Sequence, residues 1–121
     1  MKIDFIADTN FLIYIHEGKN IVEPFLDYHF GISFISEVEL LGHKNITIAE
    51  EQKLKQLLSD CFQIEWSLKL KEQTIKLKRQ YPIKLPDAII AATCLIFEIP
   101  LITADKGFSR IKELDLVLIE V

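Results

Sequence analysis

Short apolar runs alternate with longer segments of helical periodicity along this chain. The near-continuous apolar runs lie at 3–7, 31–35, 101–102 and 116–119. Strands that are buried on both faces of a parallel sheet have this pattern, because neither face meets water. We therefore expect four parallel strands. A fifth, short strand is expected at a sheet edge, where Phe62, Ile64 and Trp66 alternate with polar residues.

The segments between these runs repeat apolar residues at helical spacing. Helices are expected over 10–16, 37–43, 48–61 and 87–98, and along the stripe Leu70, Thr74, Leu77 and Tyr81. Pro86 suits the first turn of the 87–98 helix, and Pro100 prevents that helix from continuing. The small residues Ala88, Ala91 and Ala92 would let this helix lie close to the sheet.

Strands that alternate with helices predict a three-layer α/β domain, with a central parallel sheet of four to five strands flanked by helices. The chain has 121 residues, a length that suits one hydrophobic core, so residues 1–121 are expected to form a single domain. The longest apolar run, 88–97, is much shorter than the roughly 20 residues of a membrane span. Because Asp4 and Asp8 interrupt the start where a secretory signal is apolar, we expect a cytoplasmic protein without membrane contacts.

Charge and cysteine content restrict the possible functions. The chain has 14 Lys and Arg against 18 Asp and Glu, a net charge of −4, which argues against nucleic-acid binding through bulk positive charge. Cys61 and Cys94 lack the spacing of a zinc or disulfide framework, and the three histidines share no metal-ligand spacing. Any polyanion must therefore be bound locally.

Acidic residues lie near the ends of the expected strands, where open parallel sheets bind ligands. They are Asp8 after the first strand, Glu39 one helical turn after the second, Asp87 at the start of the 87–98 helix, and Asp105 after the 101–102 strand. Each has a structural alternative, since aspartates cap helices or complement helix dipoles. Glu39 also fits a capping box that begins at Ser36.

Convergence of these carboxylates would favour a bound cation. Two unit charges about 4 Å apart repel by roughly 4 kcal/mol at an effective dielectric constant of 20, and a divalent ion removes this cost. Oxygen ligands without convergent His or Cys select Mg²⁺ or Mn²⁺ over Zn²⁺. Such a site stabilises in-line displacement at phosphorus, so the expected substrate is a phosphodiester.

Four ordered segments carry these residues, namely IADTNFLIY at 6–14, ISFISEVEL at 32–40, LPDAIIAAT at 85–93 and LITADKGF at 101–108. They resemble the motifs of the PIN-domain nucleases, and in particular the small toxin ribonucleases of the VapC type. The resemblance spans most of the chain. It implies a PIN-like fold, a divalent-metal-dependent ribonuclease activity, an RNA substrate, a homodimer and a protein antitoxin. Family members also occur as free-standing nucleases, and no motif here identifies an antitoxin.

The resemblance also assigns roles to individual residues. It implies that Asp8, Glu39, Asp87 and Asp105 are both the catalytic residues and the ligands of Mg²⁺ or Mn²⁺. Asn10 and Thr103 resemble groups that orient ligands or water from behind, with local turn and cap hydrogen bonds as the alternative. Glu37 is an additional carboxylate, and Glu39 is preferred because the glutamate precedes the leucine in the family's motif.

Three basic residues flank the motifs, namely Lys84, Lys106 and Arg110. They are candidates for contacts with substrate phosphates, and the alternative for each is a solvated surface charge.

Other classes of protein fit this sequence less well. A signalling receiver domain needs a phosphoacceptor aspartate at the end of a central strand, and no central apolar strand is expected to end in one, because Asp60 lies in a helical pattern. A phosphatase with an Asp-x-Asp loop would have aspartate in place of Asn10. A non-catalytic binding module, in which the carboxylates are only helix caps, is the remaining alternative.

Overall fold

Five short strands form one sheet with the order β3-β2-β1-β4-β5. In the computed structural model, which describes residues 2–120, they are β1 (Phe5–Ala7), β2 (Phe30–Ser33), β3 (Phe62–Ile64), β4 (Leu101–Thr103) and β5 (Leu116–Leu118). Every neighbouring pair is parallel. The predicted parallel α/β sheet is confirmed, and the weak alternating segment at 62–64 is the edge strand β3.

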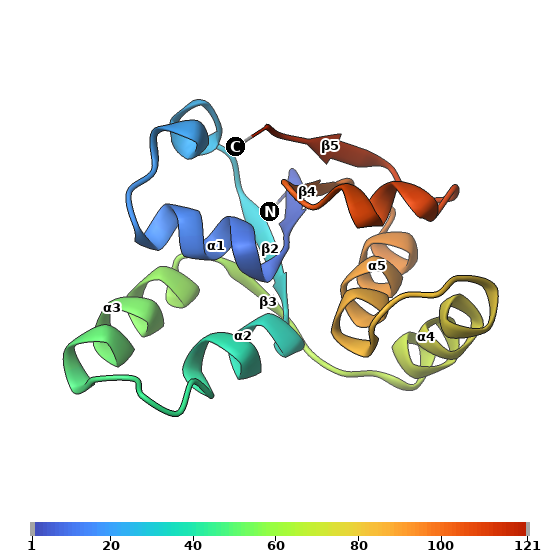
Figure 1. The fold of residues 1–121 in the computed structure, drawn as a ribbon, viewed down its shortest axis with the longest axis horizontal. Helices are drawn as coiled ribbons and strands as arrows, with labels where there is room; N and C mark the ends of the chain where they lie inside the picture. The colour runs from blue at the N-terminus through green and yellow to red at the C-terminus, as the bar shows by residue number, and fades with distance from the viewer. Residues whose placement is uncertain (1, 121) are drawn as a thin grey trace.

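Helices cover both faces of this sheet (Figure 1). They are α1 (Thr9–His16), α2 (Phe34–Leu41), α3 (Ile48–Ser59), α4 (Leu68–Gln80) and α5 (Leu85–Phe97), with two 3₁₀ helices, η1 (Asn20–Phe25) and η2 (Lys106–Arg110). The sequence pattern did not indicate the two 3₁₀ helices, which are too short for a periodic signal. Among residues 2–120, no helix has the length and apolar character needed to cross a membrane.

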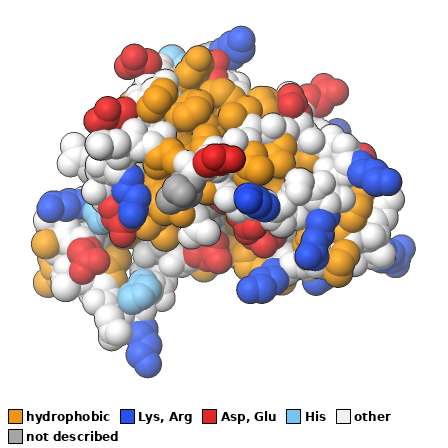
Figure 2. Space-filling model, turned by 45° about the horizontal axis from the view of Figure 1, so that its top comes forward, with side chains coloured by type: hydrophobic (Ala, Val, Ile, Leu, Met, Phe, Trp, Pro, Cys, Tyr) orange, Lys and Arg blue, Asp and Glu red, His pale blue; other side chains and the backbone are white. Residues whose placement is uncertain are grey.

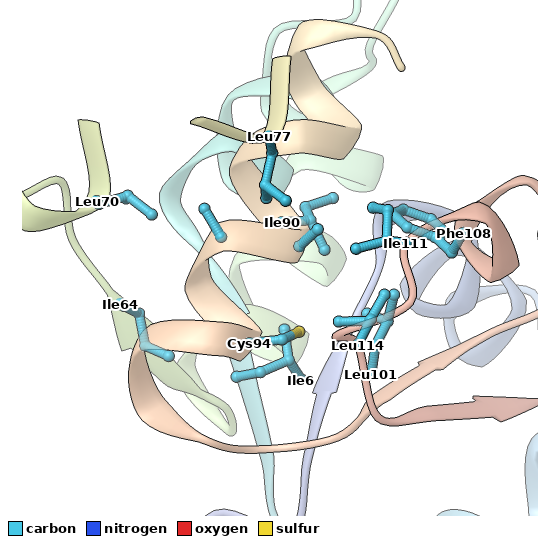
Figure 3. Close-up of a cluster of buried hydrophobic side chains, with 12 residues drawn as sticks. Ile6, Ile64, Leu70, Leu77, Ile90, Cys94, Leu101, Phe108, Ile111 and Leu114 are labelled. Atoms are coloured by element: carbon cyan, nitrogen blue, oxygen red, sulfur yellow. The ribbon is translucent and has the colours of Figure 1, made fainter. Parts of the chain in front are cut away.

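Successive side chains of the central strands pack into two separate hydrophobic cores, one on each face of the sheet. Ile6 and Leu101 belong to the core under α4, α5 and η2, whose side chains point toward one another in Figure 3. Their neighbours Ala7 and Ile102 belong to the core under α1 and α3. Because side chains alternate across a strand, this arrangement buries both faces of the sheet. The continuous apolar runs in the sequence follow from it.

The boundary between β2 and α2 corrects two sequence expectations. The strand expected over 31–35 ends at Ser33, whose Oγ accepts a hydrogen bond from the backbone N–H of Ile35 at 3.3 Å and caps α2. An apolar run has the same pattern in a buried strand and in the first turn of a buried helix, so the pattern extended the strand too far. The capping box at Ser36 is also wrong, because Ser36 is buried inside α2.

The central strand is β1, and Asp8 follows it directly. The expectation that no central strand ends in aspartate is therefore wrong, because the strand order could not be read from the sequence. A receiver domain is excluded on different grounds, since its strand order is 2-1-3-4-5. In the observed order, chain progression reverses between β1 and β4. This is the position at which doubly wound sheets bind ligands.

The small residues of α5 allow it to pack closely on the sheet, and this packing is testable. Ala91 is fully buried in the core under α4 and α5. We expect Ala91→Leu to lower the free energy of unfolding by about 1–3 kcal/mol, because the larger side chain overpacks the core. Ala49→Leu makes the same change at an exposed position of α3 and should alter it by less than about 0.5 kcal/mol. Equal losses in urea denaturation would contradict the close packing.

Candidate active site

A hollow of about 120 Å³ opens at the carboxyl end of the sheet. Its lining residues are Asp8, Thr9, Asn10, Glu39, Asp87, Ile90 and Asp105. The fold therefore brings together the four predicted carboxylates and Asn10 from four separate segments of the chain. Glu37 is not among the lining residues, which favours Glu39 as the glutamate of this site.

Asp8 is the most constrained of the four carboxylates. Its side chain is 4% exposed, and its Oδ1 caps α1 by accepting a hydrogen bond from the N–H of Phe11 at 2.8 Å. Its Oδ2 accepts a hydrogen bond from the hydroxyl of Thr103 at 2.5 Å. Burial raises the pKa of Asp8 to about 6, against the opposing effect of these two hydrogen bonds, and the charges of Asp105 and Asp87 contribute to the rise.

Thr103 joins the two strands that flank this hollow. It is the fully buried last residue of β4, and its hydroxyl donates to Asp8 while accepting a hydrogen bond from the backbone N–H of Asp105 at 3.0 Å. Asp105 in turn caps η2, because its Oδ1 accepts a hydrogen bond from the N–H of Gly107 at 2.8 Å. One hydroxyl therefore contacts both the carboxylate of the aspartate that follows β1 and the backbone of Asp105, which follows β4 by two residues.

Asp87 and Glu39 come from helices that begin at this edge of the sheet. Asp87 lies in the first turn of α5. Burial raises its pKa, the charges of Asp105 and Glu39 raise it further, and Lys84 opposes them. Glu39 is exposed on α2, and the hydroxyl of Thr9 lies 2.6 Å from its Oε1.

Sequence reasoning gave no role to Thr9. Its hydroxyl contacts both Glu39 and the Oγ of Ser36, the latter at 3.0 Å. The signal that could have found it is its position directly after Asp8, in the first turn of α1 at the ligand-binding edge. Thr9 links the first helix of the chain to the glutamate of the second.

Two of the three predicted basic residues border the acidic hollow. Lys84 and Arg110 line an adjoining hollow of about 220 Å³, together with Asp87 and Asp105. Lys106 lies in η2 and is exposed outside both linings. The face drawn in Figure 2 carries basic and acidic side chains interspersed with hydrophobic ones. Any attraction for a polyanion at Lys84 and Arg110 is therefore local.

The donor chemistry of the acidic hollow fits a hard divalent cation. Its ionisable groups are carboxylates, and burial together with the charges of neighbouring carboxylates raises the pKa of Asp8 and of Asp87. Each carboxylate oxygen has two lone pairs, so an oxygen of Asp8 that accepts one hydrogen bond can still face a cation. Within residues 2–120, however, no three His, Cys, Asp or Glu side chains lie close enough together to enclose a metal ion. Glu39 and Asp105 are the exposed carboxylates of this lining.

Comparisons with known proteins identify the family and agree with the fold. The sequence profile of the PIN domain matches residues 5–114. The fold is similar to a chain of a toxin–antitoxin complex from Klebsiella pneumoniae, with 31% identity over 98% of this chain and 100% of that one, and a TM-score of 0.83. It is also similar to chains of VapBC-1 from nontypeable Haemophilus influenzae (24% identity, 96% and 98% covered, TM-score 0.81) and of VapBC2 from Rickettsia felis (23%, 98% and 100%, 0.78). No curated protein shows a significant match.

The raised pKa of Asp8 predicts how stability depends on pH without divalent ions. Folding raises this pKa from 3.8 to about 6, so the folded state binds the proton more tightly than the unfolded state. The contribution to stability is complete below pH about 4 and is lost as pH rises through about 6, and it amounts to the order of 3 kcal/mol. Chemical denaturation of wild type and Asp8→Asn between pH 4 and 8 measures it.

The replacement should remove this part of the pH dependence, because the asparagine does not titrate. Asp27→Asn, the same change at an exposed position, should retain the wild-type profile. Parallel pH profiles for wild type and Asp8→Asn would contradict the burial of this carboxylate.

Proposed function

This chain belongs to the PIN-domain family, and on that premise we propose that it is a divalent-metal-dependent ribonuclease that hydrolyses phosphodiester bonds of RNA. One observation carries the proposal: the carboxylates of Asp8, Glu39, Asp87 and Asp105 line a single hollow at the position where the order of the strands reverses. A hollow of this charge would repel a phosphodiester unless cations occupied it. We therefore propose that these four residues hold Mg²⁺ or Mn²⁺.

The residues around the hollow have separate tasks in this mechanism. A bound divalent cation would offset negative charge on the attacking water and on the leaving oxygen. Thr103 holds the carboxylate of Asp8 by its 2.5 Å hydrogen bond, and Thr9 holds that of Glu39 at 2.6 Å. Residues that orient ligands in this way raise both affinity and activity. Asn10 faces the same hollow, where its amide can orient water.

Lys84 and Arg110 are proposed to bind the RNA backbone next to the cleavage position. They line the hollow that shares Asp87 and Asp105 with the acidic site, so a phosphate held there has its neighbour in the acidic hollow. Guanidinium and ammonium groups attract phosphate without reading the base. Lys106 lies outside this lining, and its contribution should be smaller.

A buried aspartate is a costly helix cap, which supports an enzyme over a silent binding module. Asn or Ser would cap α1 equally well without a buried charge. Burial raises the pKa of Asp8 to about 6, so ionisation at neutral pH lowers stability. Carboxylates with pKa values shifted by burial and by like charges are typical of functional sites.

We further propose that this ribonuclease is the toxin of a toxin–antitoxin pair. The support is the similarity to a chain of a toxin–antitoxin complex, which is 31% identical to this one and aligns with it over its full length. The expected partners are a second copy of this chain and a protein antitoxin that blocks the acidic hollow. A free-standing nuclease without antitoxin is the alternative. Co-purification of the product of the neighbouring reading frame, together with loss of RNA cleavage in the complex, would distinguish them.

Metal binding should stabilise the fold. At about 100 times its dissociation constant, Mn²⁺ should raise the free energy of unfolding by about 2.7 kcal/mol and the melting temperature by roughly 10 °C. Asp8→Asn and Glu39→Gln should lose most of this shift. Glu37→Gln should retain it, because Glu37 lies outside the lining. A melting temperature unchanged by saturating Mn²⁺ in the wild type would refute the metal site.

RNA cleavage should require the same carboxylates. Asp87→Asn and Asp105→Asn should each reduce the rate of metal-dependent cleavage of single-stranded RNA by more than about 100-fold. This exceeds the loss of activity expected when a residue that only orients a metal ligand is replaced. Gel analysis of end-labelled RNA with Mg²⁺ or Mn²⁺ measures this rate. Cleavage that persists in EDTA, or in both variants, would show that another site or a contaminant is responsible.

The proposed backbone contact at Lys84 should appear mainly in substrate binding. Lys84→Ala should raise KM for RNA by about tenfold with a smaller change in kcat, because a charged contact is lost. Lys106→Ala removes the same charge outside the hollow and should change KM by less than about twofold. If both variants change KM equally, each lysine contributes only to the overall electrostatic potential of the protein, and the proposed contact at Lys84 is wrong.

A further inference from the structure

A second and larger cavity opens beside the acidic hollow, between α1, α2 and α3. Its volume is about 310 Å³, and Thr9 and Glu39 line both cavities. The contact of Thr9 with Glu39, at 2.6 Å, therefore lies in the wall between them. An RNA strand whose scissile phosphate occupies the acidic hollow would bring an adjacent nucleotide to this second cavity.

The lining of this cavity is unsuited to a phosphate. Among the described residues that line it there is no Lys or Arg. The carboxylates of Glu17 and Glu50 can only accept hydrogen bonds when ionised. Lys19 does not line the cavity, but its Nζ lies 3.9 Å from the Oε1 of Glu17 and offsets part of that charge. Ile13, Leu40 and Leu54 contribute apolar surface. The cavity therefore suits an uncharged group that has an apolar face and hydrogen-bond donors at its edge.

Two imidazole rings complete the lining. His16 ends α1, and His43 follows the end of α2. The Nδ1 of His43 accepts a hydrogen bond from the backbone N–H of Asn45 at 3.4 Å, which leaves Nε2 as the donor of the neutral ring. Histidine rings are among the side chains on which RNA bases stack.

This cavity is rich in hydrogen-bond acceptors, is lined by two histidines and adjoins the acidic hollow. We therefore propose that the cavity is a subsite for a nucleobase with an exocyclic amino group. Adenine and cytosine carry this amino group where uracil presents a carbonyl oxygen, and guanine carries its amino group at a different ring position. A carboxylate such as that of Glu17 accepts from the amino group and repels the carbonyl. This inference deepens the proposed ribonuclease function and rests on it. It predicts selection against uracil at one position beside the cleaved bond.

Nucleosides test the subsite without any need for catalysis or metal. Adenosine, cytidine and uridine lack phosphate, so the charge of the acidic hollow does not oppose them. Titrated into the wild-type protein, adenosine and cytidine should move the imidazole NMR signals of His16 and His43 in a saturable way, and uridine should move them far less. His29 is the internal control, because it lies outside the cavity lining. No movement for any nucleoside, or equal movement for all three, would overturn the subsite.

Variants then connect the cavity to base preference. Glu17→Gln replaces an acceptor with an amide that also donates, so discrimination between adenosine and uridine should fall by about tenfold. His43→Ala should weaken adenosine binding by about tenfold through loss of stacking. Glu23→Gln, the same chemical change as Glu17→Gln at an exposed position of η1 outside the lining, should change neither quantity.

Cleavage of an RNA pool of random sequence completes the test. The wild type should disfavour uracil at one position next to the cut, and Glu17→Gln should relax that preference. A preference that is identical in wild type, Glu17→Gln and His43→Ala would overturn the subsite while leaving the ribonuclease intact. Absence of metal-dependent cleavage by the wild type would instead refute the proposed function, and the nucleoside titration would still decide whether the cavity binds bases.

Discussion

The hydrogen bond from Thr103 to Asp8 joins the two strands between which the order of the sheet reverses. Burial and the neighbouring carboxylates both oppose the negative charge of Asp8 at the end of β1. The hydroxyl of Thr103 and the N–H of Phe11 satisfy both of its oxygens. A buried carboxylate without such partners would lower the stability of the domain by several kcal/mol.

Two of the residues that line the acidic hollow also cap helices. Asp8 caps α1 and Asp105 caps η2, while each also faces the acidic hollow. A carboxylate has two oxygens with two lone pairs each, so capping and ligand binding do not exclude one another. The structural alternative considered for Asp8 and Asp105 is thus confirmed, and it is compatible with the proposed function.

The surroundings of the acidic hollow differ on its two sides. Lys84 and Arg110 line the cavity that adjoins Asp87 and Asp105. Histidines, carboxylates and apolar side chains line the one that adjoins Glu39. A nucleic-acid strand has a charged backbone and uncharged bases, and this division of charge corresponds to those two parts. In a protein of net charge −4, the proposed binding of a polyanion rests on local rather than overall charge.

The sequence by itself determined the parallel sheet and its α-helices, because strands that are buried on both faces leave continuous apolar runs between segments of helical periodicity. It also indicated the acidic residues near the ends of these strands, because polar residues there interrupt the apolar pattern. Only the tertiary structure decided that β1 is central, that Ser33 rather than Ser36 caps α2, and that Thr9 reaches Glu39. Strand order, helix starts within apolar runs and contacts between residues 30 apart depend on packing between segments. Local periodicity carries no information about that packing.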